Sequence, residues 1–421
     1  MFKFIHAADI HLDSPLRGLS RYESTPVESI RDACRRAFEN LVDIAINEKV
    51  AFVLLAGDLY DGDWKDYSTG IFLSQQMGRL GQQNISVFAV AGNHDAANRM
   101  TKALDSPTNM TILSSRKVET VRLYDIEVVI HGRSYGAQHV DENLAASFSP
   151  AEKGMFNIGL LHTSLDGREG HAVYAPCTLD DLQSKGYQYW ALGHIHKQEF
   201  VSEDPWIVFP GCVQGRHIRE TGPKGCVLVT VEDCNVTEVE KISLDVFRWA
   251  QCNVDLTDVT EMREVLECTR KIIEKERTSV EGRPIAMRIR FEGSTKISDA
   301  LSAYPERFEQ QIKALGAEIA GENLWIERIE NVAVGKLDLD STLANDSAFG
   351  KLLNDILSTP NSPDEIDGLK DVVAELRQKI PSEVFNADSV LNLDDAHSIE
   401  RLVQEAKKML IGRLLMVGGE K

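Results

Sequence analysis

The chain has 421 residues, of which 43% are hydrophobic and 26% charged; this ordinary globular composition excludes intrinsic disorder, collagen-like repeats and low-complexity sequence. It carries 46 Lys+Arg against 65 Asp+Glu, and the formal charge of −19 argues against a protein that coats nucleic acid or anionic membrane by bulk electrostatics. A chain of this length exceeds one typical core, so two or three domains are expected.

Short apolar runs alternate with helical patterns over residues 1–245. Uninterrupted apolar runs predict strands buried on both faces, and apolar residues at helical spacing predict helices over 27–47 and 67–80. The strands are expected at 2–8, 51–56, 85–91, 117–123, 127–131, 157–162, 187–192, 206–209 and 226–231. This alternation predicts a layered α/β core, with sheets flanked by helices.

A second, smaller α/β pattern follows over 246–337, with strands expected at 249–256, 284–291 and 324–334 and helices at 261–275 and 306–319. Residues 338–400 hold 14 Asp/Glu against 4 Lys/Arg and several turn formers, which predicts a linker with short helices. Residues 398–417 place apolar side chains on one helical face. We therefore predict three parts: the core (1–245), a small α/β capping domain (246–337), and an acidic linker with a C-terminal helical segment (338–421).

Seven scattered cysteines, with no CxxC pair, indicate reduced thiols and argue against a disulfide framework or a structural zinc site. The N-terminus lacks a signal-peptide pattern, and no apolar run approaches the roughly 18 residues that a membrane span needs. These features predict a soluble, cytoplasmic protein.

Five polar motifs stand where predicted strands end. They are Asp9-x-His11, Gly57-Asp58-x-x-Asp61, Gly92-Asn93-His94-Asp95, His162 and Gly193-His194-x-His196. Functional side chains of α/β sheets gather at the carboxyl ends of the strands, so these residues are expected to converge.

Carboxylate, amide and imidazole groups are ligands for divalent first-row metals, and two ions sharing a carboxylate can activate a nucleophile for attack on phosphorus. The DxH and HxH spacing predicts that both side chains point to one side of an extended segment. The glycines are expected to form sharp turns. One such motif alone is usually a surface or capping coincidence, whereas five in this order favour a site.

This signature, intact over residues 9–196, resembles that of the calcineurin-like metallophosphoesterases. The stretches 9–19, 132–135 and 210–222 are similar to those of the bacterial YhaO-type, SbcD-related DNA repair exonucleases. The resemblance is strong over 1–245, is limited to the general layout over 246–337, and is weak over 338–421.

The resemblance implies two divalent metal ions, and the family prefers Mn2+. Metal one would be held by Asp9, His11, Asp58 and His196. Metal two would be held by Asp58, Asn93, His162 and His194, with Asp58 bridging. It further implies that His94 is the catalytic acid, and Asp95 is expected to orient it.

The chain departs from the family pattern at two positions. Asp61 stands where some nucleases of the superfamily carry a histidine that assists cleavage, so we expect only a supporting hydrogen bond from it. Cys212 replaces the usual serine of a Pro-Gly-Ser turn, which weakens the case for a phosphate contact there.

Arginines near the strand ends are candidates for substrate binding. Arg216, His217 and Arg219 form either a phosphate-contacting loop or an exposed turn paired with Glu220, and the residues leave both open. Arg17 and Arg133 are further candidates.

The terminal helix either packs on its own domain or docks a partner through one apolar face. That face comprises Ile399, Leu402, Val403, Ala406 and Leu410. In the resembled branch the partner is a large SbcC-like or YhaN-like coiled-coil ATPase, and a homodimer is also expected.

The leading hypothesis is therefore a two-metal exonuclease acting on DNA ends in repair. The alternatives are a phosphoesterase for a small nucleotide or phosphoprotein, and a non-catalytic scaffold between DNA and an ATPase. About half of the excess negative charge lies in 338–400, and two divalent ions would offset several site carboxylates. The acidity is thus compatible with DNA, but it predicts weak, salt-sensitive binding by this chain alone.

Overall fold

The computed structural model describes residues 1–14, 32–61, 67–97, 107–165, 174–335 and 348–360, with single positions between 400 and 410. The described residues form two compact units. Unit 1 comprises Met1–Cys252, Ile272–Ile289 and Lys313–Arg328, and the remainder is unit 2. The predicted domain boundaries at 245/246 and 337/338 stay predictions.

The first sheet has six strands in the order β12-β11-β1-β2-β3-β4. Its strands are β1 (Phe2–Ala7), β2 (Phe52–Ala56), β3 (Ser86–Val90), β4 (Met110–Ile112), β11 (Gly225–Glu232) and β12 (Asn235–Ser243). β1 to β4 run parallel, and β11 pairs antiparallel with β1. All four carboxyl ends of the parallel strands therefore lie at one edge.

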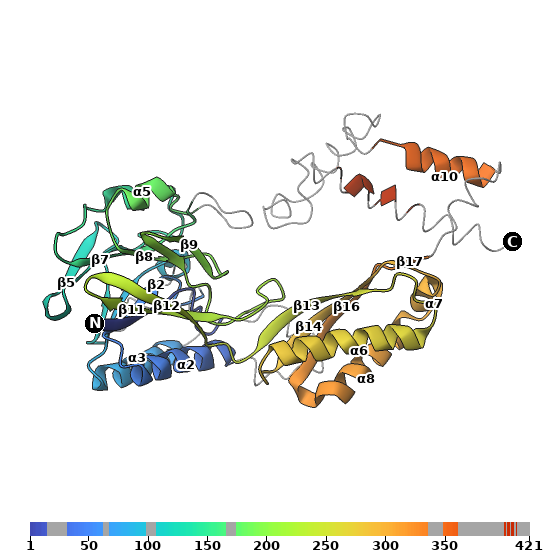
Figure 1. Ribbon diagram of the computed structural model, residues 1–421, viewed down its shortest axis with the longest axis horizontal. Helices are drawn as coiled ribbons and strands as arrows, with labels where there is room; N and C mark the ends of the chain where they lie inside the picture. The colour runs from blue at the N-terminus through green and yellow to red at the C-terminus, as the bar shows by residue number, and fades with distance from the viewer. Residues whose placement is uncertain are drawn as a thin grey trace. The chain divides into compact units, whose positions relative to one another are not determined.

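Helices α2 (Ala33–Asn47) and α3 (Ser68–Gln82) cover one face of this sheet (Figure 1). Their apolar residues, including Phe38 and Met77, pack with Ile5, Val53 and Val87 from the strands. At about 25 cal/mol per Å2 of buried apolar surface, these contacts supply the main favourable term for folding this layer.

The second sheet also has six strands, in the order β5-β6-β7-β8-β10-β9. Its strands are β5 (Glu119–Leu123), β6 (Val128–Arg133), β7 (Phe156–His162), β8 (Tyr189–Gly193), β9 (Glu199–Glu203) and β10 (Trp206–Phe209). β6, β7, β8 and β10 are parallel neighbours. Short elements accompany these two sheets: α4 (Asn93–Ala97), α5 (Leu179–Gln183), η3 (Tyr124–Ile126) and η4 (Leu144–Ser147).

The two six-stranded sheets share an apolar core. The Phe4 ring stacks on Phe52 with centroids 5.1 Å apart and meets Tyr189 edge-on at 5.2 Å. The buried His6 contributes the polar part of this layer, because its ring nitrogens lie 3.0 Å from the Tyr189 hydroxyl and 3.1 Å from the Leu192 carbonyl. Burial lowers the pKa of His6 to about 3, so it stays neutral and has a structural role.

A three-stranded sheet in the order β13-β14-β16 follows along the chain. The elements from here on are β13 (Arg248–Asp255), α6 (Met262–Ser279), β14 (Ile285–Glu292), β15 (Ser294–Thr295), α7 (Ser298–Ala303), α8 (Pro305–Ala320), η5 (Gly321–Asn323), β16 (Leu324–Asn331), β17 (Val334–Gly335) and α10 (Ala348–Ser358).

Within unit 1, the start of β13 holds the loop that follows β10. Trp249 Nε1 donates to the Gly215 carbonyl at 3.0 Å, and Gln251 Nε2 donates to the Ile218 carbonyl at 2.9 Å.

The predicted α/β fold class is confirmed, with sheets flanked by helices. The strands and helices predicted over residues 1–337 are present within a few residues, although 27–31 of the first predicted helix lie outside the described residues. Most of the predicted C-terminal helical segment (398–417) also lies outside them. The strands β4, β9, β12 and β15 and the short helices α4, α5 and α7 were not predicted. β12 is an edge strand whose exposed and half-buried residues alternate irregularly, and Glu238, Glu240 and Lys241 interrupt its apolar pattern. Among the described residues no helix is long and apolar enough to cross a membrane.

Glycine at the end of β8 is required by the close approach of the two sheets. A Cβ on Gly193 would lie 1.9 Å from the Ala56 carbonyl oxygen at the end of β2, so a side chain would push the two strand ends apart. Gly78 on α3 offers the opposite case, because a Cβ there meets nothing within 4 Å.

We predict opposite effects on stability for two Gly→Ala substitutions. Gly193→Ala is expected to lower the free energy of unfolding by about 1–3 kcal/mol through backbone displacement. Gly78→Ala is expected to raise it by about 0.5–1 kcal/mol, because alanine is the better helix former. Urea denaturation measures both, and equal effects would contradict the close approach.

Candidate metal centre and active site

The five motifs lie at the carboxyl edge shared by the two six-stranded sheets. Asp9 and His11 follow β1, Asp58 follows β2, and Asn93 begins α4 just after β3. The second sheet supplies the other three histidines: His162 ends β7, while His194 and His196 follow β8. The predicted convergence is therefore confirmed.

The backbone at these residues is strained. Asp9, His11 and Asp58 have φ values of 51°, 47° and 51°, in the left-handed region that L-residues rarely occupy. Our prediction of an extended Asp-x-His segment was therefore wrong. Hydrogen bonds hold the strained turns together, since Asp9 N donates to the Gly57 carbonyl at 3.0 Å and His11 N to the Asp58 carbonyl at 2.9 Å. Such strain is typical of functional sites.

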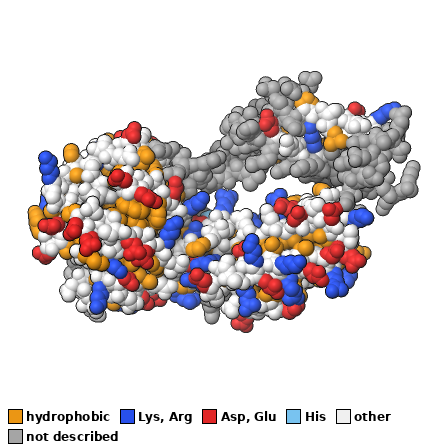
Figure 2. Space-filling view, in the orientation of Figure 1, with side chains coloured by type: hydrophobic (Ala, Val, Ile, Leu, Met, Phe, Trp, Pro, Cys, Tyr) orange, Lys and Arg blue, Asp and Glu red, His pale blue; other side chains and the backbone are white. Residues whose placement is uncertain are grey.

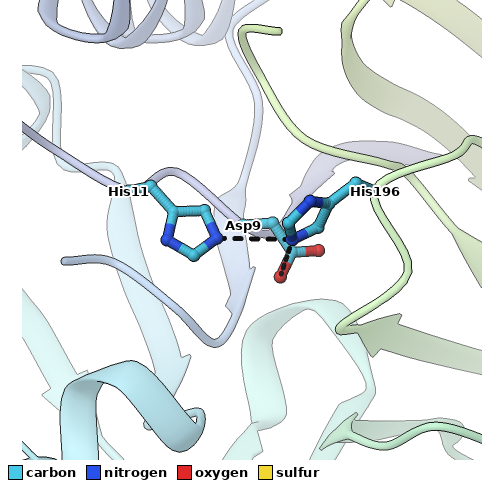
Figure 3. A group of neighbouring side chains, drawn as sticks. All are labelled: Asp9, His11 and His196. Atoms are coloured by element: carbon cyan, nitrogen blue, oxygen red, sulfur yellow. Dashed lines mark hydrogen bonds and ion pairs between the residues drawn. The ribbon is translucent and has the colours of Figure 1, made fainter. Parts of the chain in front are cut away.

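The first group of side chains comprises Asp9, His11 and His196 (Figure 3). The Nε2 atoms of the two histidines face each other at 3.4 Å, and His196 Nε2 lies 3.9 Å from Asp9 Oδ1. On its other side, His196 Nδ1 donates to Glu220 Oε1 at 2.6 Å. This bond fixes the proton on Nδ1, so the Nε2 lone pair points toward Asp9 and His11.

The second group surrounds Asp58. His162 Nε2 lies 3.5 Å from Asp58 Oδ2 and 3.2 Å from Asn93 Oδ1, and the His194 ring stands edge-on to the His162 ring with centroids 5.2 Å apart. His162 Nδ1 donates to the Ala56 carbonyl at 2.9 Å, which leaves a lone pair on Nε2. Asp58 Oδ2 is also 3.9 Å from His11 Nε2, so this carboxylate lies between the two groups.

These contacts fit a pair of cations. In both groups a histidine lone pair lies 3.2–3.9 Å from other atoms of the metal-ligand type, and one cation placed between them could be bound by all of these atoms. Ligand atoms bound about 2.0–2.2 Å from one ion would have such separations. Burial, with the charge of Asp58, raises the pKa of Asp9 well above its usual range; burial also raises that of Asp58. A cation bound by these two carboxylates would favour their ionised forms.

His94 lies beside this cluster and is held by Asp61. The two atoms Nδ1 of His94 and Oδ1 of Asp61 are 3.0 Å apart, and this bond raises the pKa of His94. Ser14 Oγ donates to the other Asp61 oxygen at 2.8 Å, so the Asp61 carboxylate is itself oriented. The side chain of His94 is 38% exposed, which gives it access to a substrate.

Asp95 does not orient His94, contrary to our expectation. Its carboxylate accepts hydrogen bonds from the backbone nitrogens of Tyr60 at 3.0 Å and Gly92 at 2.9 Å. Burial raises the pKa of Asp95 to about 7, with a further contribution from Asp58. Asp95 thus joins the second and third motifs, and the orienting carboxylate is Asp61.

Arg216 is the predicted substrate-binding residue that reaches this cluster. Its guanidinium lies 3.7 Å from Asp61 and 3.4 Å from both Glu220 Oε1 and His196 Nδ1. Its backbone nitrogen donates to Glu220 Oε2 at 2.6 Å. The predicted pairing of this turn with Glu220 is therefore present, and the turn also borders the metal-ligand cluster.

The other predicted substrate-binding residues are placed differently. His217 Nε2 lies 3.4 Å from Glu220, and Arg219 is exposed. Arg133 donates to Glu142 and Ser147 at 3.2 and 3.1 Å. Arg17 lies outside the described residues. The roles of all four in binding stay predictions.

The role of Glu220 was not predicted. This glutamate is only 5% exposed, and its Oε1 accepts a hydrogen bond from His196 Nδ1. Although burial opposes ionisation, the bond from His196 and the charge of Arg216 lower the pKa of Glu220. The sequence signal was a lone acidic residue in a Gly- and Arg-rich loop, which indicated pairing with Arg216 but not with a histidine 24 positions earlier.

Cys212, in the turn after β10, supports the segment that follows β8. It is fully buried, and its Sγ lies 3.7 Å from the His196 carbonyl oxygen. The side chain therefore braces the backbone of His196.

Two family models match the chain. Residues 2–198 match "Calcineurin-like phosphoesterase", and residues 249–333 match "Metallophosphoesterase YhaO, middle domain". The "Uncharacterized metallophosphoesterase YhaO" of Bacillus subtilis (strain 168) is 35% identical over 373 residues, which cover 87% of this chain and 90% of that protein.

More distant similarities extend to a repair protein and a phosphatase. The "DNA double-strand break repair protein Mre11" of Sulfurisphaera tokodaii is 27% identical over 297 residues, covering 67% of this chain and 72% of its own. The crystal structure of a dimetal phosphatase from Danio rerio is similar over 55% of this chain and 92% of that chain, at 12% identity and a TM-score of 0.34.

We predict that Mn2+ raises the melting temperature of the chelator-treated protein by about 5–10 °C at a hundredfold excess over its Kd. Asp58→Asn should remove most of this rise. It should also raise the melting temperature without metal, because one buried charge is lost. Calorimetry measures both, with Asp233→Asn in the exposed β11–β12 turn as the matched control. A full metal-dependent rise in Asp58→Asn would contradict the assignment.

We also predict that Glu220→Gln weakens Mn2+ affinity about 10–100-fold, because the hydrogen bond that fixes the His196 tautomer loses its ionic partner. Isothermal titration of metal into the variant measures this. Glu238→Gln on the exposed edge of β12 is the matched control. Equal affinities in the two variants would show that Glu220 does not position His196.

Proposed function

The chain belongs to the calcineurin-like metallophosphoesterases of the YhaO type, and we propose that it is a two-metal phosphodiesterase that degrades DNA ends. Membership of this family implies a phosphoester hydrolase with a dinuclear divalent metal site. The observation that carries the proposal is His94, held by Asp61 at 3.0 Å beside Asp and His side chains that could hold metal ions.

The residues divide the chemistry between them. Asp9, His11, Asp58 and His196 would hold one ion, and Asp58, Asn93, His162 and His194 the other. Two ions held by these residues would activate a water and would neutralise charge on the attacked phosphate. His94 donates a proton to the departing sugar oxygen, while Asp61 keeps its ring oriented. Arg216 presents positive charge to the phosphate.

Similarity to a repair protein favours DNA as the substrate. The 297 residues that are similar to Mre11 form a longer stretch than the 2–198 matched by the catalytic family model. We infer that the likeness includes parts of the chain that select the substrate as well as the catalytic core. A small nucleotide or a phosphoprotein remains the alternative substrate, and a non-catalytic scaffold is disfavoured because no ligand side chain is missing.

We further propose that the enzyme acts in the cytoplasm with Mn2+, as a homodimer and as the nuclease subunit of an SbcC-like or YhaN-like coiled-coil ATPase complex. The C-terminal part of the chain supports a docking role. Leu352 and Leu357 on α10 are 44% and 43% exposed, and Leu410, from the predicted docking face, is 51% exposed. Ile399 of that face lies outside the described residues.

We predict Mn2+-dependent digestion of linear DNA by the wild-type protein. His94→Ala should lower kcat about 10²–10⁴-fold, and Asp61→Asn at least tenfold, because the acid is lost or misoriented. Gel assays with duplex and single-stranded DNA, with and without the ATPase, measure this.

The control for this assay is metal content, which should be the same in Asp61→Asn as in wild type. Hydrolysis of a chromogenic phosphomonoester with no cleavage of DNA would favour the alternative substrates. Full activity of His94→Ala would contradict the proposed acid.

A further inference from the structure

A cavity of about 330 Å3 lies beside the metal centre in unit 1, on the side of His196. Its walls come from the loop after β8, the turn after β10, the start of β11 and the end of β12. Because β11 runs antiparallel to β1, its first residues lie at the carboxyl end of β1, the edge where Asp9 and His11 follow. The cavity therefore lies at the same edge of the first sheet, and His196 both lines it and belongs to the metal-ligand cluster.

The charge of the cavity is opposite to that of the chain. Lys224 and Lys241 line it, and none of its lining residues is acidic. Elsewhere carboxylates predominate: the chain carries a formal charge of −19, and Asp and Glu side chains are spread over the face shown in Figure 2. The cavity is thus a local basic site in an acidic protein, which we call the lysine groove.

Both lysines are held in place. Lys224 Nζ donates to the His196 carbonyl at 3.2 Å, and Lys241 Nζ lies 4.6 Å above the Phe200 ring. A cation over an aromatic face keeps its charge and its remaining donors. Gln198 and Ser243 add neutral polar side chains to the lining.

The floor of the groove is rigid. Pro210 and Pro223 line it together with Gly211, which has a φ of +77°. A Cβ on Gly211 would lie 2.9 Å from Gln198 N, so the turn can approach the loop after β8 only as glycine. The cavity volume is at the lower end of the range for small-ligand sites, which suits a single nucleotide unit.

We propose that the lysine groove binds a backbone phosphate of the DNA strand adjacent to the phosphodiester being cleaved. Lysine ammonium groups bind phosphate as point charges, and two of them beside His196 would fix the strand next to the metal centre. This inference rests on the proposed function, and it adds the surface by which an acidic protein holds a polyanionic substrate.

The test compares cleavage of a long substrate with cleavage of a short one. Wild type, Lys241→Gln and Lys241→Arg are assayed with Mn2+ on a 5′-labelled oligothymidylate of about 20 nucleotides and on bis(4-nitrophenyl) phosphate, which is too short to reach the groove. Lys153→Gln, an exposed lysine before β7, is the matched control for lost charge. Lys241→Gln should lower kcat/KM on the oligonucleotide at least fivefold relative to the small diester, and Lys241→Arg should retain most of it.

Binding gives a second readout. With Ca2+ in place of Mn2+, the slope of log affinity against log salt for the oligonucleotide should fall by about 0.7 in Lys241→Gln, the value for one phosphate contact on a single strand. If wild type digests the oligonucleotide but Lys241→Gln and Lys153→Gln give equal kcat/KM and equal salt slopes, the groove proposal is contradicted and the proposed function stands. If wild type hydrolyses only the small diester, the proposed function fails and the groove proposal fails with it.

Discussion

Two buried carboxylates, Asp9 and Asp58, set the main physical constraint on this structure. Removing an ionised carboxylate from water is costly, and placing a second one nearby adds repulsion. The chain offsets part of this cost with its own backbone, because His194 N donates to both Asp9 oxygens at 3.2 and 3.1 Å and His94 N donates to Asp58 at 3.0 Å. Divalent cations bound by these side chains would offset the remainder.

The strained turns follow from the same constraint. Asp9 and Asp58, which follow β1 and β2, have left-handed φ values. The chain therefore turns at the sheet edge and keeps both carboxylates there, whereas an extended chain would carry them beyond the edge. The packing beneath must therefore be strong enough to hold this backbone conformation. The close contact of Phe4 with Phe52 and Tyr189, one layer below, supplies part of that support.

Much of the fold and the convergence of the polar motifs could be predicted from the sequence, because buried parallel strands are continuous apolar runs and polar motifs mark their ends. The edge strand β12 escaped prediction since its charges disrupt both periodicities. The orienting partner of His94 could not be predicted either. Asp95 is its neighbour in the chain, but the turn after β2 brings Asp61 against the ring, and spacing alone does not reveal that contact. Glu220 is a similar case, because its bond to His196 depends on a loop that β13 holds from outside the predicted core.

The exposed edge strand β12 has a consequence for the behaviour of the protein in solution. An edge strand presents unpaired backbone groups that can add strands from other molecules, and charged side chains are the common defence. Glu238, Glu240 and Lys241 place both signs of charge along β12, so a second copy docking there would have to desolvate all three. Part of the acidity of the chain thus protects an open sheet from aggregation, independently of catalysis.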